Sequence, residues 1–123
     1  MITKAEFNKK LEEVNKQRDQ GSAEFNKEAG NQFQAIFDFD NAISYYQKSL
    51  IYVQDHNTED VAHTYFLLGL MYDNKDEYDT ALEFYKKALD IQEKVLGEDH
   101  PDTATTYHNM GGCMTKKASM TRH

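Results

Sequence analysis

The chain has 123 residues, a single proline, no tryptophan and a net charge of −7, from 14 lysine and arginine residues against 21 acidic residues. This length suits one domain, and the shortage of proline beside many helix-forming residues argues against a sheet protein. The negative charge argues against broad binding to nucleic acid, because a phosphate backbone attracts clustered positive charge.

The first predicted element is an N-terminal helix, which begins at the capping-box pair Thr3 and Glu6. One face of this helix, at helical spacing, carries Phe7, Leu11, Val14 and Arg18. We expect Gly21-Ser22 to end the helix, although Phe25 continues its stripe and one longer helix is the alternative. The stripe predicts a capping helix over residues 1–21.

Two helical hairpins are expected after the capping helix. Their four helices are predicted over residues 22–37, 40–53, 59–74 and 78–96. A polar stretch at residues 54–57 separates the hairpins, and Thr58 is the predicted N-cap of the helix that follows it. Gly97 suits the left-handed conformation that ends a helix.

A last helix is predicted over residues 102–117. Pro101 suits its start, because the missing N–H group of a proline is not needed there. We expect His100, just before this proline, to have a structural capping role. Gly111-Gly112 should weaken the helix, and the tail over residues 120–123 should be frayed.

The hairpins and the last helix repeat one sequence pattern. Gly69 and Gly111, with similar residues around them, lie 42 residues apart, and Gly30 lies 39 residues before Gly69. Aligning these glycines matches Asp40 with Asp79, Ala42 with Ala81, Tyr46 with Tyr85, Lys48 with Lys87 and Leu50 with Leu89. The small residues are expected to let helix backbones approach closely. Because one hairpin cannot bury all of this apolar surface, the period predicts a stacked solenoid.

This arrangement of glycine, tyrosine, alanine and aromatic positions resembles the tetratricopeptide repeat, from residue 23 to about residue 114. The run Leu89–Ala104, which contains His100-Pro101, resembles the 42-residue repeat of kinesin light chains. The resemblance implies an all-α fold, a right-handed superhelical solenoid of antiparallel helix pairs. It divides the chain into a first repeat at residues 22–57, a second at 58–100, and a partial third repeat or C-terminal capping helix at 101–123.

The resemblance also implies that the first helix of each repeat lines a concave groove that receives a peptide segment of a partner protein. The candidate groove residues are Lys27, Asn31, His63, Phe66, Leu67, Leu70, Asn74, Thr105, His108 and Asn109. Their polar ends and apolar middle suit an extended or short helical peptide with one apolar anchor. The alternative for Phe66, Leu67 and Leu70 is packing against the next repeat. Asn109 stands where kinesin-light-chain-like repeats carry an asparagine that pairs with the backbone of the bound peptide.

The segment from Lys27 to Asn31 also resembles the first helix of carboxylate-clamp repeats, which grip the acidic C-terminal tails of heat-shock chaperones. A lysine and an asparagine one turn apart can together hold a terminal carboxylate. The three remaining clamp positions carry Leu67, Thr105 and Asn109 here, so two of the three cations of a clamp are missing. A chaperone cofactor that binds acidic C-terminal tails is the alternative function, because Lys27 and Asn31 match the clamp. If the clamp is not formed, these two residues belong to a solvated helix face.

Catalytic and metal chemistry find no support in the sequence. No two of the five histidines lie at i, i+4 on a helix, and none neighbours a cysteine at metal-ligand spacing. His108 and Cys113 point to different helix faces, and Gly111-Gly112 lacks the surrounding residues of a phosphate loop. We expect a non-enzymatic protein–protein interaction module, a scaffold or adaptor, with no cofactor, no metal and no nucleic-acid partner.

Self-association is a third possibility, carried by the stripe of the N-terminal helix. We expect this stripe to cap the first repeat within the chain, which otherwise exposes apolar side chains. If it stays open, a homodimer through the N-terminal helix or through the open C-terminal end is the alternative.

The sequence also bears on the compartment. Its apolar runs are far shorter than the roughly 20 residues that span a bilayer, and residues 1–6 lack the apolar core of a signal peptide. Cys113 is the single cysteine, so no intrachain disulfide can form. We therefore expect a soluble, cytoplasmic protein with no membrane partner.

Overall fold

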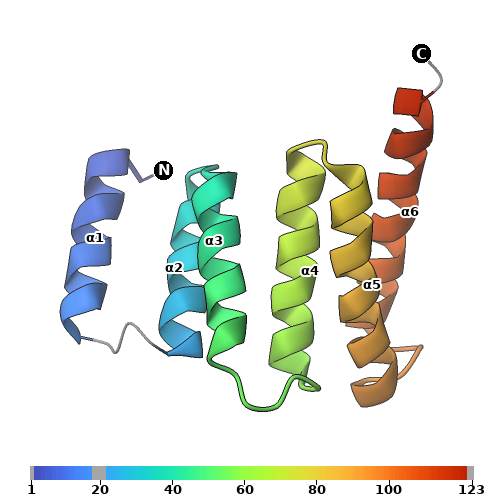
Figure 1. Ribbon diagram of the computed structural model, residues 1–123, viewed down its shortest axis with the longest axis horizontal. Coiled ribbons are helices and arrows are strands. Elements are labelled where there is room, and N and C mark those ends of the chain that lie inside the picture. The colour runs from blue at the N-terminus through green and yellow to red at the C-terminus, as the bar shows by residue number, and fades with distance from the viewer. Residues whose placement is uncertain (1, 18–21, 122–123) are drawn as a thin grey trace. The chain divides into compact units, whose positions relative to one another are not determined.

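The structure, a computed structural model, describes residues 2–17 and 22–121 of the chain. The described residues form six helices and no strand: α1 (Lys4–Gln17), α2 (Ala23–Ala35), α3 (Phe39–Ile51), α4 (Glu59–Asn74), α5 (Tyr78–Val95) and α6 (Pro101–Thr121) (Figure 1). They fall into two compact units, unit 1 (Met1–Gln54) with α1 to α3 and unit 2 (Asp55–His123) with α4 to α6. None of the described helices has the length and apolar character needed to cross a bilayer. The expected all-α fold is confirmed.

Local sequence signals place the helix ends in unit 2. The Thr58 hydroxyl oxygen accepts a hydrogen bond from the first turn of α4 (3.2 Å), so the predicted N-cap is confirmed. Gly97 follows α5 with a φ of 92°, which lies in the left-handed region that favours glycine. Pro101 begins α6 as predicted. His100 caps this helix, because its Nδ1 accepts a hydrogen bond from the Asp102 N–H (3.1 Å).

Helix α6 is longer and more continuous than the sequence predicted. It passes through Gly111-Gly112 without a break and continues to Thr121, so the expected end at residue 117 and the fraying of residues 120 and 121 are wrong. The last two residues lie outside the described part of the chain. Three residues of α6 are completely buried, namely Thr103, Thr106 and Cys113. Their packing offsets the cost of about 1 kcal/mol that each helical glycine brings.

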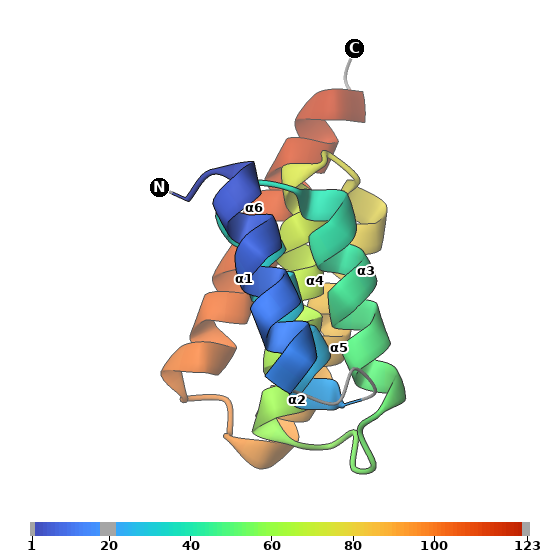
Figure 2. The same cartoon turned by 90° about the vertical axis from the view of Figure 1, so that its left-hand side faces the viewer.

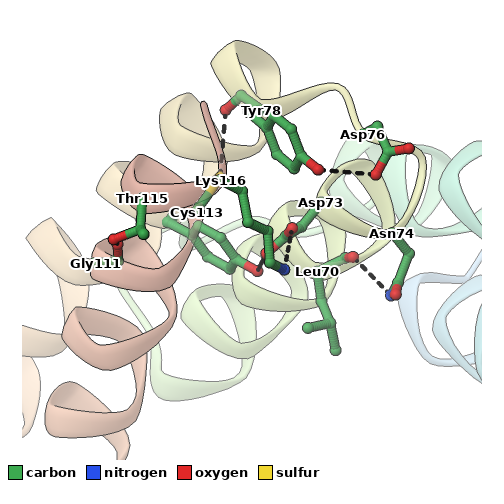
Figure 3. Close-up of polar contacts among 10 residues, drawn as sticks. Leu70, Asp73, Asn74, Asp76, Tyr78, Gly111, Cys113, Thr115 and Lys116 are labelled. Carbon is green, nitrogen blue, oxygen red and sulfur yellow. Dashed lines mark hydrogen bonds and ion pairs between the residues drawn. The ribbon is translucent and has the colours of Figure 1, made fainter. Parts of the chain in front are cut away.

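A buried carboxylate, Asp73 of α4, joins the three helices of unit 2 (Figure 3). Its Oδ2 accepts a hydrogen bond from the Tyr85 hydroxyl of α5 (3.2 Å), and its Oδ1 accepts one from the Lys116 Nζ of α6 (3.0 Å). The Cys113 thiol adds a contact of 3.6 Å to the Tyr78 carbonyl oxygen. These contacts hold the part of α6 that follows its two glycines.

Each unit packs a tyrosine ring against a glycine of the neighbouring helix. A Cβ atom added to Gly30 would lie 2.7 Å from the Tyr46 ring, and one added to Gly69 would lie 2.5 Å from the Tyr85 ring. Both tyrosines are completely buried. The nearest atoms are ring atoms and not backbone atoms, so the repeated glycine makes room for the ring. The sequence had instead suggested a close approach of backbones.

Aromatic stacking accompanies each glycine contact. In unit 1 the Phe33 and Tyr45 rings stack with centroids 5.3 Å apart and an interplanar angle of 14°. In unit 2 the Tyr72 and Phe84 rings stack at 5.5 Å and 6°. The two pairs occupy equivalent positions, so both hairpins pack their helices by the same rule.

Helix α1 packs on α2 within unit 1 (Figure 2). Phe7 is 1% exposed, and its ring centroid lies 4.2 Å from that of Phe33. Leu11 is half-buried, while Arg18 and the side chain of Val14 lie outside the described part of the chain. The Phe7 contact is the one that capping within the chain requires.

We expect Gly69→Ala to lower the free energy of unfolding by about 1–3 kcal/mol, because the added methyl group overlaps the Tyr85 ring. The matched control is Gly112→Ala, where nothing lies within 4 Å of the added atom. Removing that helical glycine should raise stability by about 0.5–1 kcal/mol. Urea unfolding followed by circular dichroism measures both changes. Equal effects of the two substitutions would contradict the packing role of Gly69.

The protein should lose stability as the pH rises above about 10. Burial raises the pKa of Tyr46 and of Tyr85, and the hydrogen bond to Asp73 raises the pKa of Lys116. The folded state therefore keeps protons that the unfolded chain releases. Urea midpoints measured between pH 8 and pH 11 should fall, and Tyr85→Phe should flatten this fall, whereas Tyr52→Phe, at an exposed ring, should not. A midpoint that stays constant to pH 11 would refute the expectation.

Candidate functional site

A cleft of about 100 Å³ opens between α4 and α6 in unit 2. It is lined by His63 and Phe66 of α4, Gln92 of α5, and Asp102, Thr105 and Thr106 of α6. A water molecule takes about 30 Å³ in the liquid. The cleft is therefore large enough for one side chain of a partner.

The α4 side of the cleft is aromatic. The His63 and Phe66 rings stack with centroids 6.4 Å apart and an interplanar angle of 21°. Phe66 also packs against the buried Tyr85 ring, with centroids 5.8 Å apart. This contact fixes the Phe66 ring and leaves it half-buried, so part of its surface remains available to a ligand.

The α6 side of the cleft presents hydrogen-bond acceptors. Thr105 donates its hydroxyl proton to the Pro101 carbonyl oxygen (2.9 Å), and Thr106 donates its proton to the Asp102 carbonyl oxygen (3.2 Å). With these protons in use, the threonine oxygens can only accept. The Asp102 carboxylate adds a negatively charged acceptor, so this wall favours a ligand that carries N–H groups.

Gln92 lines the cleft from α5 and is 5% exposed. Among the described residues, its Oε1 has no hydrogen-bond partner, and the atom is shielded from solvent. An acceptor buried without a donor costs about 1–3 kcal/mol. A ligand N–H group that reached this oxygen would recover part of that cost.

The repeat pattern, the helix pairs and the glycine contacts agree with a family comparison. The sequence model of the tetratricopeptide repeat matches residues 23–94 and, in a second register, residues 60–118. The chain belongs to the tetratricopeptide repeat family. Members of this family serve as protein–protein interaction modules, and this chain has the fold of such a module.

Individual known proteins match different shares of the chain. A clustered mitochondria protein homolog of Emericella nidulans is 39% identical over 51 residues, which is 42% of this chain and 4% of that protein. A crystal structure of MamA matches with a TM-score of 0.70 and 26% identity, covering 92% of this chain and 56% of that one. BtubC of P. vanneervenii shares the fold, with a TM-score of 0.74, 17% identity and coverages of 92% and 47%. The chain thus spans about half of these solved structures.

The structure brings three predicted groove residues, His63, Phe66 and Thr105, to one cleft. The sequence analysis missed Gln92, Asp102 and Thr106, because it considered only one face of the first helix of each repeat. The length of α5 was an available signal. This helix has 18 residues against 13 in α3, and Gln92 lies in the part that α3 lacks.

The remaining predicted residues of unit 2 are spread around the cleft. Leu67 is 7% exposed, so its side chain packs in the interior and does not line an open groove. Leu70 is half-buried, and its carbonyl oxygen accepts a hydrogen bond from the exposed Asn74 side chain (2.9 Å). His108 is exposed. Asn109 is half-buried and lies one turn after Thr105 on the same face of α6, so its groove role stays a prediction.

The two predicted residues of unit 1 have local surroundings that the sequence did not suggest. The Tyr46 hydroxyl donates a hydrogen bond to the Asn31 amide oxygen (2.6 Å). Lys27 lies one turn before Asn31 on α2 and is half-buried. Asn31 therefore helps to hold the buried tyrosine ring, a structural task that competes with ligand binding.

The described residues hold no group of three or more histidine, cysteine and acidic side chains that could bind a metal ion. Cys113 is completely buried, and this burial raises the pKa of its thiol. The thiolate is the reactive form of cysteine. Cys113 is thus a packing residue of α6, held mainly as the thiol.

We expect no micromolar binding of a peptide with an acidic C-terminal tail. Tyr46 already engages Asn31, and Leu67, Thr105 and Asn109 supply no cation for a terminal carboxylate. Fluorescence titration of the labelled peptide, beside the same peptide amidated at its C-terminus, tests this expectation. Binding that disappears on amidation would contradict it and would assign the chain to the carboxylate-clamp class.

Proposed function

We propose that the chain is a non-enzymatic scaffold or adaptor module that binds a peptide segment of a partner protein in the cleft between α4 and α6. One observation carries the proposal: a cleft with room for one side chain places the Phe66 ring beside Gln92, whose buried oxygen has no donor among the described residues. The single cysteine, buried as a thiol, suits a reducing compartment, so we place this function in the cytoplasm.

The chemistry of the cleft favours a particular kind of peptide. The Phe66 ring suits an apolar side chain or the hydrocarbon stem of a lysine or arginine. The acceptors of Gln92, Asp102 and the two threonines suit N–H donors of the same side chain or of the peptide backbone. The net charge of −7 raises the encounter rate with a basic partner. The preferred ligand is therefore a basic segment with one anchor side chain.

Asn109 extends this binding surface along α6. It lies one turn beyond Thr105, and an asparagine amide offers both a donor and an acceptor to a peptide backbone. An extended peptide whose anchor occupies the cleft would pass this side chain. We therefore assign Asn109 the role of holding the peptide backbone, with His63 at the opposite wall.

Peptides selected from a random display library on the immobilised chain provide the probe for this function. Their affinity should fall about 5- to 100-fold with Phe66→Ala and with Asn109→Ala, which corresponds to about 1–3 kcal/mol. Isothermal titration measures the change, and circular dichroism checks that the helical content is unchanged. The selected peptides should also be enriched in lysine or arginine.

The matched control is Phe37→Ala, which removes an exposed phenylalanine of unit 1 that lies outside the cleft. The selected peptides should bind this variant like the parent chain. If they lose affinity with Phe37→Ala and keep it with Phe66→Ala, the peptide site lies in unit 1 and the proposed cleft is wrong.

A further inference from the structure

One apolar face of α6 is uncovered. It consists of Ala104, Tyr107, Gly111 and Met114, which recur at helical spacing and are all exposed; we refer to it as the open face. Tyr107 is 49% exposed and Met114 is 53% exposed. In the part of the chain that the structure describes, no atom lies within 4 Å of a Cβ atom added to Gly111. Large apolar side chains beside a bare glycine mark a surface built for contact.

The equivalent face of α4, 42 residues earlier, shows what covers such a surface. It consists of Ala62, Tyr65, Gly69 and Tyr72. Ala62 is 1% exposed, and Gly69 lies under a tyrosine ring of α5. The Tyr65 and Tyr72 rings both stack on Phe84 of α5, with centroids 6.2 and 5.5 Å apart. The face of α4 is therefore covered by the second helix of its own repeat.

Unit 1 repeats this contact with a different sequence. Gly30 lies under the Tyr46 ring, and Phe33 stacks on Tyr45. The covering helices α3 and α5 share an alanine, two adjacent aromatic residues and a lysine at fixed offsets: Ala42, Tyr45, Tyr46 and Lys48 in α3, and Ala81, Phe84, Tyr85 and Lys87 in α5. The shared residues of α3 and α5 therefore define the sequence pattern of a helix that covers the glycine-bearing face of another helix.

The charges around the open face complement the lysine of this pattern. In unit 2 the Lys87 Nζ lies over the Tyr65 ring, 5.6 Å from its centroid. The equivalent tyrosine of α6, Tyr107, donates a hydrogen bond to the Glu93 carboxylate (2.6 Å). This hydrogen bond and the negative charges of Glu98 and Asp90 raise the pKa of the Tyr107 hydroxyl group. A partner lysine at the position equivalent to Lys87 would therefore lie over the Tyr107 ring and close to negatively charged carboxylates.

We propose that the open face of α6 binds an amphipathic helix of a partner protein that carries the pattern alanine, two intervening residues, two aromatic residues, one intervening residue and lysine. The second aromatic ring packs on Gly111, and the first stacks between Tyr107 and Met114. A second copy of this chain is not the occupant, because the two segments with this pattern already bury Tyr46 and Tyr85 in their own units.

The partner helix and the peptide of the cleft use different surfaces. The open face is turned away from the cleft, because Thr105 and Tyr107 lie about 160° apart around α6. Binding of a helix at the open face therefore does not depend on the proposed peptide function. It would complete a third helix pair with one helix from each protein.

The test uses a labelled peptide with the sequence of α5, Tyr78–Val95, acetylated and amidated, and the full chain. Fluorescence anisotropy should show saturable binding, with Gly111→Ala lowering the affinity at least 10-fold. The physical reason is that a Cβ atom at this position would meet the docked ring at the distance of 2.5–2.7 Å seen for Gly69 and Gly30. The matched control is Gly112→Ala, which removes the neighbouring glycine on a different face and should leave the affinity unchanged.

Several outcomes overturn the proposal. One is the absence of peptide binding, and another is binding that is equally strong with Gly111→Ala, which would indicate exchange with the chain's own α5. A peptide with the Tyr85→Ala change that binds like the parent peptide would also overturn it. Light scattering without peptide completes the test: a dimer that Gly111→Ala dissociates would show that a second copy is the occupant. Phe66→Ala should leave binding of the α5 peptide intact, which separates this surface from the cleft.

Discussion

The packing of a tyrosine ring on a helical glycine is the contact on which both units depend. It sets the distance between the two helices of a pair, since a glycine and a flat ring fill the space that larger side chains would keep open. The stacked aromatic pairs flank the glycine and fix the rotation of each helix. The hydroxyl groups of the same tyrosines reach polar side chains of the first helix, Asn31 in unit 1 and Asp73 in unit 2. In each unit, the same tyrosine packs its ring on the glycine and donates a hydrogen bond from its hydroxyl group.

The two candidate surfaces of unit 2 follow from this packing. The Tyr85 ring that fills the space at Gly69 also supports Phe66, the aromatic wall of the cleft. On the other side of α6, the same helix geometry repeats around Gly111 without a ring to fill it. The cleft depends on the contact between Gly69 and the Tyr85 ring. The open face exists because no described ring packs on Gly111.

Much of the fold was predictable from local sequence, because helix ends depend on neighbouring residues. The bounds of α4 match the prediction, and Thr58 and Gly97 act as expected. The continuity of α6 was not predictable, since it rests on contacts such as Lys116 with Asp73, which are 43 residues apart. Of the six cleft residues, three could be predicted from the sequence. His63, Phe66 and Thr105 follow from repeat positions, whereas Gln92 belongs to a helical extension without a counterpart in α3.

The group that accepts the hydrogen bond of the buried tyrosine differs between the two units, and this difference affects how unit 2 unfolds. In unit 1 the residue at the place of Asp73 is Gln34, a neutral side chain whose amide lies 2.8 Å from the Tyr46 hydroxyl. In unit 2 a carboxylate stands there, and its compensating cation, Lys116, comes from the next helix. Detachment of α6 would remove this cation from the Asp73 carboxylate, so the ion pair links the folding of α6 to that of the second helix pair. Unit 2 should therefore melt in a single cooperative step.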